Sequence, residues 1–170
     1  MASTFLVSDT HFGHEKICTF YRADGTPLRP WDNYQEMEDA LVENWNSVVK
    51  EGDRVYHLGD VALTKSGLKV LGKLNGRKVL IRGNHDIYSL KDYTKYFEDI
   101  RGCFVRDLLA FTHVPVHPES FRGKWVGNIH GHLHYIKHDD PRYYNVCVEC
   151  TDYTPIDYEA VRAYFDDRAT

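Results

Sequence analysis

The chain has 170 residues, of which 42% are apolar and 27% charged. This balance is typical of a globular protein and argues against a disordered or membrane-spanning one, and the length fits a single domain over residues 1–170. The formal net charge of −4 disfavours a broad basic surface that would grip nucleic acid. We therefore expect no stable nucleic-acid complex, and only a local basic cleft stays compatible with the composition.

The first ten residues lack the basic region and the long apolar run of a signal peptide. No apolar stretch approaches the roughly 20 residues that span a bilayer, so we expect a cytoplasmic protein without a membrane partner. The four cysteines are then expected to be reduced. Cys147 and Cys150 form one CxxC pair without a second, so an extended strand is favoured there over a zinc site.

Strands and helices are predicted to alternate in the first half of the chain. Apolar runs predict strands over residues 4–8, 54–58 and 78–81. Apolar residues at helical spacing predict a helix that Asp32 and Gln35 cap and that Gly52 ends. Further helices are predicted over residues 66–74 and near residues 90–97, and the stretch from Thr10 to Trp31 is expected to be mainly loop.

The second half is richer in predicted strands. They cover residues 103–106, 108–111 and 126–129, with an edge strand over residues 145–148 and a closing helix over residues 157–167. The whole order predicts the α/β fold class, as a layered mixed β-sheet of the α/β/β/α sandwich type with flanking helices. Polar motifs follow the carboxyl ends of these strands, where open α/β sheets place ligand sites, so we expect the strand ends to converge on one rim.

Ten histidines are present, and five of them belong to a series of short polar motifs. In chain order the motifs are Asp9-Thr-His11, Gly59-Asp60, Gly83-Asn84-His85-Asp86, His113 and Gly131-His132-Leu-His134. Carboxylate, amide and imidazole ligands without a thiolate suit manganese, iron, zinc or nickel better than copper(I) or an iron–sulfur cluster. Alternate residues of an extended segment point the same way, so Asp9 and His11 are expected to share an ion. The same alternation would point His132 and His134 of the last motif into the site.

Taken alone, Asp9-Thr-His11 and Gly83-Asn84-His85-Asp86 are more typical of turns than of metal sites, and Gly131-His132-Leu-His134 alone is compatible with half of a chance metal site. Together and in this order, the motifs resemble those of the calcineurin-like metallophosphoesterase superfamily. Three added segments are similar to its small, stand-alone bacterial and phage branch, namely Phe12-Gly-His14, Arg29-Pro-Trp31 and Tyr56-His-Leu-Gly-Asp60. The resemblance covers roughly residues 5–135.

This resemblance implies two divalent metal ions with manganese favoured in vitro. One ion would be held by Asp9, His11, Asp60 and His134, and the other by Asp60, Asn84, His113 and His132. Asp60 would bridge the two ions, and His85 would stay unligated beside the scissile phosphate as an acid or transition-state stabiliser. Two ions about 3.5–4 Å apart can generate a bridging hydroxide near neutral pH and clamp a phosphate during attack. The predicted activity is hydrolysis of phosphodiesters, and also of phosphomonoesters, with His85 and Asp60 as the catalytic residues.

One departure from the sequence pattern of the superfamily narrows the class of substrate. Protein Ser/Thr phosphatases of this superfamily follow Gly-Asp with an Asp-Arg-Gly, whereas Gly59-Asp60 is followed here by Val-Ala-Leu63. This argues against a phosphoprotein phosphatase and leaves the orienting partner of His85 open. Asp86 either orients His85 or holds the loop.

Other polar residues are assigned less directly. His14, Arg29 and Arg82 are candidates for substrate binding. His14 is close in sequence to the first motif, and Arg suits bidentate contact with phosphate. Surface or structural salt bridges fit the two arginines equally well. His57 and His130 are interpreted as core histidines and not as ligands.

The substrate is expected to be nucleotide-like, with diesters favoured. A nuclease acting on nucleic-acid ends is the alternative enzyme, and it is kept open by a run of basic residues: Lys65, Lys69, Lys73, Arg77 and Lys78. A non-catalytic interaction scaffold of the same fold is a further alternative. It is disfavoured because every expected ligand position and His85 are filled.

Overall fold

The computed structural model describes residues 2–167. Its first sheet has the strand order β4-β3-β2-β1-β9, in which the four strands β1 to β4 run parallel and β9 is antiparallel to β1. The strands are β1 (Thr4–Val7), β2 (Arg54–His57), β3 (Arg77–Ile81), β4 (Asp99–Arg101) and β9 (Ile156–Asp157). Because the central strands are parallel, their carboxyl ends lie at the same edge of the sheet.

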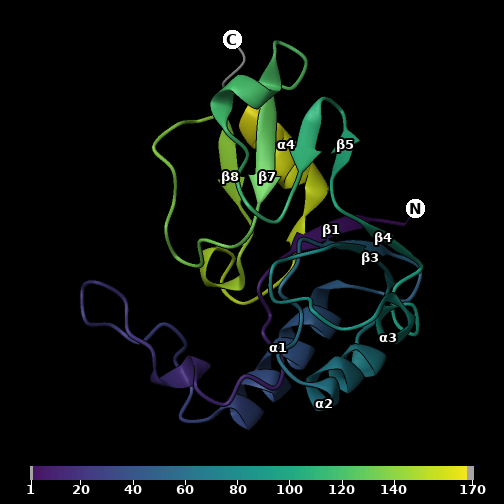
Figure 1. Ribbon diagram of the computed structural model, residues 1–170, viewed down its shortest axis with the longest axis vertical. Helices are drawn as coiled ribbons and strands as arrows, with labels where there is room; N and C mark the ends of the chain where they lie inside the picture. Colours follow the sequence, from purple (N-terminus) through teal and green to yellow (C-terminus); the bar gives the residue numbers. More distant parts are fainter. Residues whose placement is uncertain (1, 168–170) are drawn as a thin grey trace.

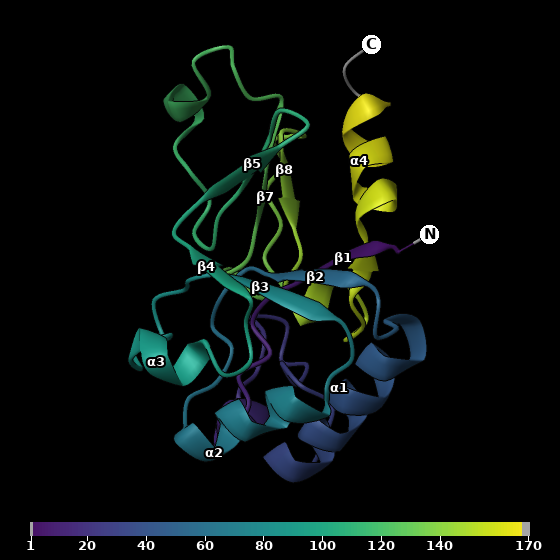
Figure 2. The same ribbon diagram turned by 90° about the vertical axis from the view of Figure 1, so that its right-hand side faces the viewer.

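The second sheet has the order β5-β6-β7-β8, with β5 antiparallel to β6 and the other pairs parallel. Its strands are β5 (Phe104–Arg106), β6 (Leu109–Phe111), β7 (Gly127–His130) and β8 (Tyr143–Asn145). Figure 1 shows this sheet in the upper half of the molecule and the first sheet below it. Turned by 90°, the first sheet is seen nearly edge-on, between the helices and the second sheet (Figure 2).

Helices cover the outer face of the first sheet (Figure 2). They are α1 (Tyr34–Val48), α2 (Lys65–Leu68) with the 3-10 turn η2 (Lys69–Lys73), and α3 (Leu90–Tyr93). Along α1, Met37, Leu41 and Trp45 recur at helical spacing and are buried against β-strand residues such as Val55 and Leu80. Burying one such side chain contributes about 1.5–3 kcal/mol, so this face fixes α1 on the sheet.

A second apolar cluster fills the space between the sheets. Leu6 and Tyr56 of the first sheet meet Phe111 and Ile129 of the second, and the final helix α4 (Tyr158–Asp166) packs into the same cluster. Tyr56 stacks on Phe104 of β5 with ring centroids 5.1 Å apart. The predicted mixed α/β class, with layered sheets and flanking helices, is confirmed. No helix in residues 2–167 is long and apolar enough to cross a membrane.

The cap of α1 differs from the prediction. Asn33 is the N-cap, since its side chain accepts from the Glu36 backbone N–H at 3.0 Å and donates to the Glu36 carboxylate at 2.8 Å. The predicted pair of Asp32 and Gln35 is therefore wrong by one residue. The helix ends at Val48, before Gly52, because the chain turns extended at the buried Val49.

Other boundaries also differ. The predicted helix over residues 66–74 is one α-turn followed by 3-10 geometry, and the helix near residues 90–97 ends at Tyr93. The edge strand lies at Tyr143–Asn145, and Val148–Cys150, predicted as strand, is a 3-10 turn (η4). Strands β4 and β9 were not predicted, because two or three residues give too short a pattern to recognise. The remaining short turns are η1 (Ile17–Thr19) and η3 (Pro118–Phe121).

Candidate metal centre

The polar motifs meet where the parallel strands end. Asp9 follows β1, Asp60 follows β2, Asn84 follows β3, His113 follows β6, and His132 follows β7. Six of their side chains form two groups with the spacing of metal sites. The first group is Asp9, His11 and His134, and the second group is Asp60, His113 and His132; within each, the potential ligand atoms lie within 4.8 Å of one another.

One carboxylate oxygen of Asp9 is available to a metal ion, and the other accepts hydrogen bonds. Its Oδ2 accepts hydrogen bonds from the Ser8 hydroxyl at 2.5 Å, from the His132 backbone N–H at 2.9 Å and from the Cys147 thiol at 3.1 Å. Its Oδ1 is buried and has no hydrogen-bond partner in the described part of the chain, and the same holds for both ring nitrogens of His11. Buried polar atoms are rarely left unsatisfied, so the pair fits a cation between Asp9 Oδ1 and His11 Nε2, which lie 3.6 Å apart.

The protonation states of these two residues suit metal binding. Burial opposes ionisation of Asp9, but the contact with His11 and the nearby histidines hold the pKa of that carboxyl well below its usual range. Burial lowers the pKa of His11 below its ordinary value. The first group therefore offers a carboxylate and a neutral imidazole, the forms that bind metal.

A buried ion pair braces the third member of this group. His134 Nδ1 lies 2.9 Å from Glu149 Oε1, and the Nε of Arg29 donates to the same oxygen at 2.8 Å. Although burial opposes it, the charge of Arg29 and the bond from His134 lower the pKa of Glu149. A carboxylate that receives Nδ1–H fixes the ring so that Nε2 faces the metal, as in many metal-bound histidines.

Arg29 is part of this brace. Its side chain is fully buried, and its Nη2 donates to the Asp9 backbone carbonyl at 2.6 Å. The predicted substrate contact of Arg29 is therefore wrong, and the alternative of a structural salt bridge holds. Glu149 was missed by the sequence analysis; the available signal was a lone acidic residue within the otherwise apolar run of residues 146–150.

Asp60 lies between the two groups. Its Oδ2 is 3.7 Å from His11 Nε2 and 3.4 Å from His113 Nε2, which is the position of a carboxylate that serves both groups. Burial opposes ionisation, but the contact with His113 lowers the pKa of Asp60. His113 donates through Nδ1 to the Leu58 carbonyl at 2.7 Å, which leaves Nε2 facing the site.

Asn84 and His132 complete the second group. The side-chain oxygen of Asn84 is 2.9 Å from His113 Nε2, and His132 Nδ1 is 3.3 Å from the same atom. Asn84 is exposed and His132 is half-buried, so this group is more open to solvent than the first. The structure thus brings together all seven residues that the resemblance implies as ligands.

His85 stands at the mouth of the centre. Its side chain is 51% exposed and its Nε2 lies 4.0 Å from Asp60 Oδ2, while its backbone N–H donates to Asp60 Oδ1 at 2.8 Å. Asp86 does not orient the ring. Its buried carboxylate accepts from the backbone N–H groups of Asp60, Val61 and Gly83, and so ties the loops after β2 and β3 together.

The backbone at the site is unusual. Five of the seven implied ligands have φ between 50° and 70°, namely Asp9, His11, Asp60, His132 and His134. Non-glycine residues held in this left-handed region cost on the order of 1–3 kcal/mol each, and they cluster at functional sites. The expectation that an extended backbone orients these pairs is therefore wrong. It is the left-handed turns after the strands that aim them.

The other histidines divide as expected. His57 and His130 are fully buried, and burial lowers the pKa of the first to about 3 and of the second to about 4. Their interpretation as core histidines is confirmed. His14 is half-buried, with its ring 5.6 Å from that of His11, and burial lowers its pKa to about 4. Its position beside the centre leaves a contact with substrate as a prediction.

Two of the basic residues that favoured a nuclease are engaged within the protein. Lys78 is buried and donates to the carbonyls of Leu74 and Gly76, and Lys65 lies 3.9 Å from Asp92. Arg82 is exposed and braces the His85 loop by donating to the carbonyls of Asp86 and Tyr88. A contact of Arg82 with substrate stays a prediction.

No family model matches this chain. It is 35% identical over 173 residues to the uncharacterized protein MJ1445 of Methanocaldococcus jannaschii, a match that covers 95% of this chain and 90% of that protein. The chain belongs to the MJ1445 family. The Gene 66 protein of Mycobacterium phage L5 is 35% identical over 91 residues, which is 51% of this chain and 41% of the phage protein.

Two solved structures are similar to this member of the MJ1445 family. The protein of unknown function AQ665 from Aquifex aeolicus superposes with a TM-score of 0.74 at 27% identity, over 96% of this chain and 99% of that one. A novel archaeal phosphodiesterase superposes with a TM-score of 0.51 at 20% identity, over 84% and 82% of the two chains. The second likeness is one of fold.

Proposed function

We propose that this protein is a metal-dependent phosphoesterase of the calcineurin-like metallophosphoesterase superfamily, in its small stand-alone branch. The observation that carries the proposal is the position of Asp60 between two His/Asp groups, with the half-exposed His85 beside it. The fold shared with an archaeal phosphodiesterase supports the proposal.

The residues present fit a pair of divalent ions. In the proposed assignment Asp9, His11 and His134 hold one ion, Asn84, His113 and His132 hold the other, and Asp60 contacts both. The donors are oxygen and nitrogen atoms, which suits manganese, iron, zinc or nickel, and we expect manganese to support activity in vitro. When bound, such a pair supplies a nucleophile by lowering the pKa of water, and it stabilises the charge of the phosphate.

The chain's own residues bind and orient the reactants. His85 lies on the exposed side of Asp60 without being a member of either group, so its ring can reach a phosphate that enters from solvent. In its protonated form it can donate a hydrogen bond to a phosphate oxygen, or donate its proton to the leaving oxygen. The hydrogen bond from its backbone N–H to Asp60 Oδ1 fixes the position of His85 relative to the metal centre.

We propose phosphodiesters, and secondarily phosphomonoesters, of nucleotide-like compounds as substrates. The active site is open and no protein nucleophile is needed. His14, beside His11, is the candidate for contact with the substrate.

The test is a screen of purified protein, reconstituted with manganese, against generic and nucleotide mono- and diesters. Metal-dependent turnover that a chelator abolishes supports the proposal. Two bound ions without turnover on any ester, together with a stable protein partner in pull-down, would favour the scaffold alternative. Turnover of oligonucleotides alone would favour the nuclease.

A further inference from the structure

A second polar cluster lies at the opposite ends of the strands from the metal centre. Thr4, Arg54 and Arg77 are the first residues of β1, β2 and β3, and they pair across the sheet in register. Thr4 and Asp9 are five residues apart along one extended segment, so the two regions are separated by about 16 Å.

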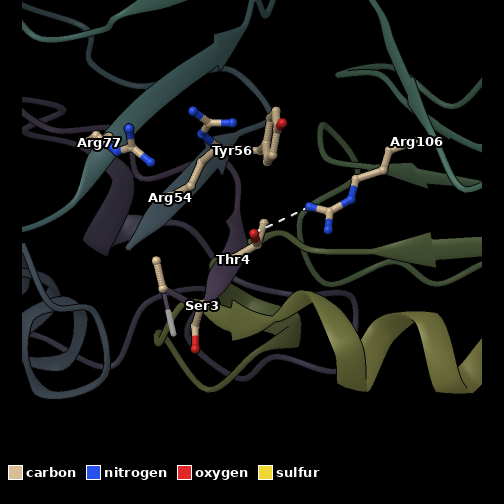
Figure 3. A pocket seen from close by; sticks show the side chains of 7 residues that line it. Ser3, Thr4, Arg54, Tyr56, Arg77 and Arg106 are labelled. Atoms are coloured by element: carbon tan, nitrogen blue, oxygen red, sulfur yellow. Dashed lines mark hydrogen bonds between the residues drawn. The ribbon is translucent and has the colours of Figure 1, made fainter. Parts of the chain in front are cut away.

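These side chains lie at the edge of the core between the two sheets. Successive side chains of a strand alternate between faces, so Arg54 shares its face with Tyr56, which packs between the sheets. From the second sheet, Arg106 of β5 reaches across and its Nη1 donates to the Thr4 hydroxyl at 3.3 Å. Figure 3 shows the side chains of Arg54, Arg77 and Arg106 around one pocket, with the ring of Tyr56 between Arg54 and Arg106.

The space is a cavity of about 350 Å³, lined by Thr4, Arg54, Tyr56, Arg77, Arg106 and residues 2–3. We refer to it as the arginine cleft. It is large enough for a small anion with its hydration, and none of its lining residues belongs to the metal centre.

Several N–H groups in the arginine cleft are unused. A guanidinium carries five donors. Arg54 contacts Glu98 through Nη2 at 3.2 Å, while its Nε is buried without a hydrogen-bond partner. Within residues 2–167, Arg77 is exposed and has no hydrogen bond or ion pair from its side chain.

The charge balance at the cleft is positive. Arg54 faces Glu98, and Arg106 faces Asp107 at 3.4 Å, and both acidic side chains are well exposed, at 37% and 49%. The neighbouring Arg101 is paired with Asp99 at 2.6 Å. Among residues 2–167 Arg77 has no acidic counterpart, so its positive charge is not compensated by them, although the chain has a net charge of −4.

We propose that the arginine cleft is a binding site for a phosphate group, separate from the metal centre. Guanidinium groups that approach from different strands match a tetrahedral anion, whose oxygens point in several directions and can each accept a charge-assisted hydrogen bond. The Thr4 hydroxyl, whose oxygen accepts from Arg106, keeps its own O–H to donate at the same place. The source is either free phosphate or a phosphoryl group on a small ester. This inference does not rest on the proposed hydrolytic activity.

The experiment is a titration of zinc-loaded, 15N-labelled protein with inorganic phosphate and, in a second arm, with phenyl phosphate. We expect saturable shifts of the amide and Arg Nε–H signals of Arg54, Arg77 and Arg106. These signals distinguish the arginine cleft from the metal centre, because anion binding at the metal centre would shift the signals of His85 and His132 instead. Shifts in the phosphate arm identify a site for free phosphate, and shifts in the ester arm alone identify a site for a phosphoryl group on a ligand. Shifts in neither arm overturn the proposal.

Arg54→Gln and Arg77→Gln each remove one donor group, and each is expected to weaken binding about tenfold. Lys69→Gln is the matched control, because it removes one exposed positive charge from η2 and should leave the affinity unchanged. If Lys69→Gln lowers the affinity for phosphate as much as the arginine variants do, the binding is general charge attraction and the proposed site is wrong. The same outcome would follow if sodium chloride at equal ionic strength gave the same shifts.

Discussion

The two halves of the metal centre are built differently. The first group rests on a buried network: Asp9 is held by Ser8 and Cys147, and His134 is held by Glu149. The second group is held mostly by backbone, since His113 donates to the Leu58 carbonyl, and it faces solvent through Asn84 and His132.

This contrast gives the two halves different expected behaviour. Ligands held in place before binding lose less freedom when the ion arrives, so a braced group binds more tightly than a loose one. We expect the first group to keep its ion on dilution and the second to exchange its ion readily with solvent.

Asp60→Asn removes the carboxylate that serves both halves and should have the largest effect. Loss of a charged oxygen between two cations is expected to lower turnover by about a thousandfold or more and to disturb both ions. Metal content by elemental analysis and turnover on a generic diester measure this. Asp39→Asn, on the exposed face of α1, is the control and should retain both. A variant that keeps two ions and full turnover would show that Asp60 does not join the halves.

His85→Ala should leave both halves intact and reduce only the rate. General acid catalysis contributes about a hundred- to ten-thousandfold, and the loss should be greatest for esters with poor leaving groups. Metal titration measures whether both ions still bind, and turnover of a series of esters with different leaving groups measures the loss of proton donation. His117→Ala, on an exposed loop, is the matched control. An equal loss for good and poor leaving groups would contradict proton donation and favour binding of the phosphate by His85.

Glu149→Gln should distinguish the halves from each other. It keeps the shape of the side chain but weakens the brace on His134, so the first ion should bind about 10- to 100-fold more weakly while the second is unchanged. Calorimetric titration of the two ions is the measurement. Glu119→Gln on the exposed η3 turn is the control.

The Glu149 variant also leaves Arg29 buried without its charge partner, which lowers stability. Circular dichroism at the assay temperature therefore has to show folded protein. If both ions weaken equally in folded protein, the ion pair only stabilises the fold and does not position His134.

The sequence was sufficient for the three central strands of the first sheet, β1 to β3, and for the candidate ligands that gather at the strand ends. Buried strands such as β1 and β3 contain continuous apolar runs, Phe5 to Val7 and Val79 to Ile81, and the polar motifs follow shortly after such runs stop. The parallel order of the strands then brings these ends to one edge. Short-range patterns carry this information, so it can be read without the structure.

What supports the centre could not be read in the same way. Glu149 and Arg29 are 120 residues apart in the chain, and their pairing depends on how the loop before α1 packs against η4. Asp86 looks like a partner for the adjacent His85, yet its carboxylate turns to backbone N–H groups of the neighbouring loop. Likewise, the left-handed backbone of Asp9 and His11 is imposed by tertiary contacts, against the preference of these residues.

His57 offers the smallest and most local test of the buried half. The Thr10 hydroxyl donates to the Val61 carbonyl, so it accepts from Nε2–H of His57 at 2.9 Å, and the buried Nδ1 has no partner. Burial lowers the pKa of His57 from 6.5 to about 3. Above pH 6.5 the ring is neutral in both states. As the pH falls below 6.5 the unfolded chain binds a proton that the folded chain refuses, and stability falls by about 1.4 kcal/mol per pH unit.

His57→Phe keeps the ring buried and removes this titration, so the free energy of unfolding should fall less steeply between pH 6 and pH 4, by about 1.4 kcal/mol per unit. Urea denaturation of metal-free protein at several pH values measures the slope. Acid also protonates the ligand histidines, but they are present in both proteins, so the difference between the slopes isolates His57. His117→Phe should keep the wild-type slope. An unchanged slope in the His57 variant would mean that the ring is protonated in the folded protein, and that the buried half of the centre is more open to water than its packing indicates.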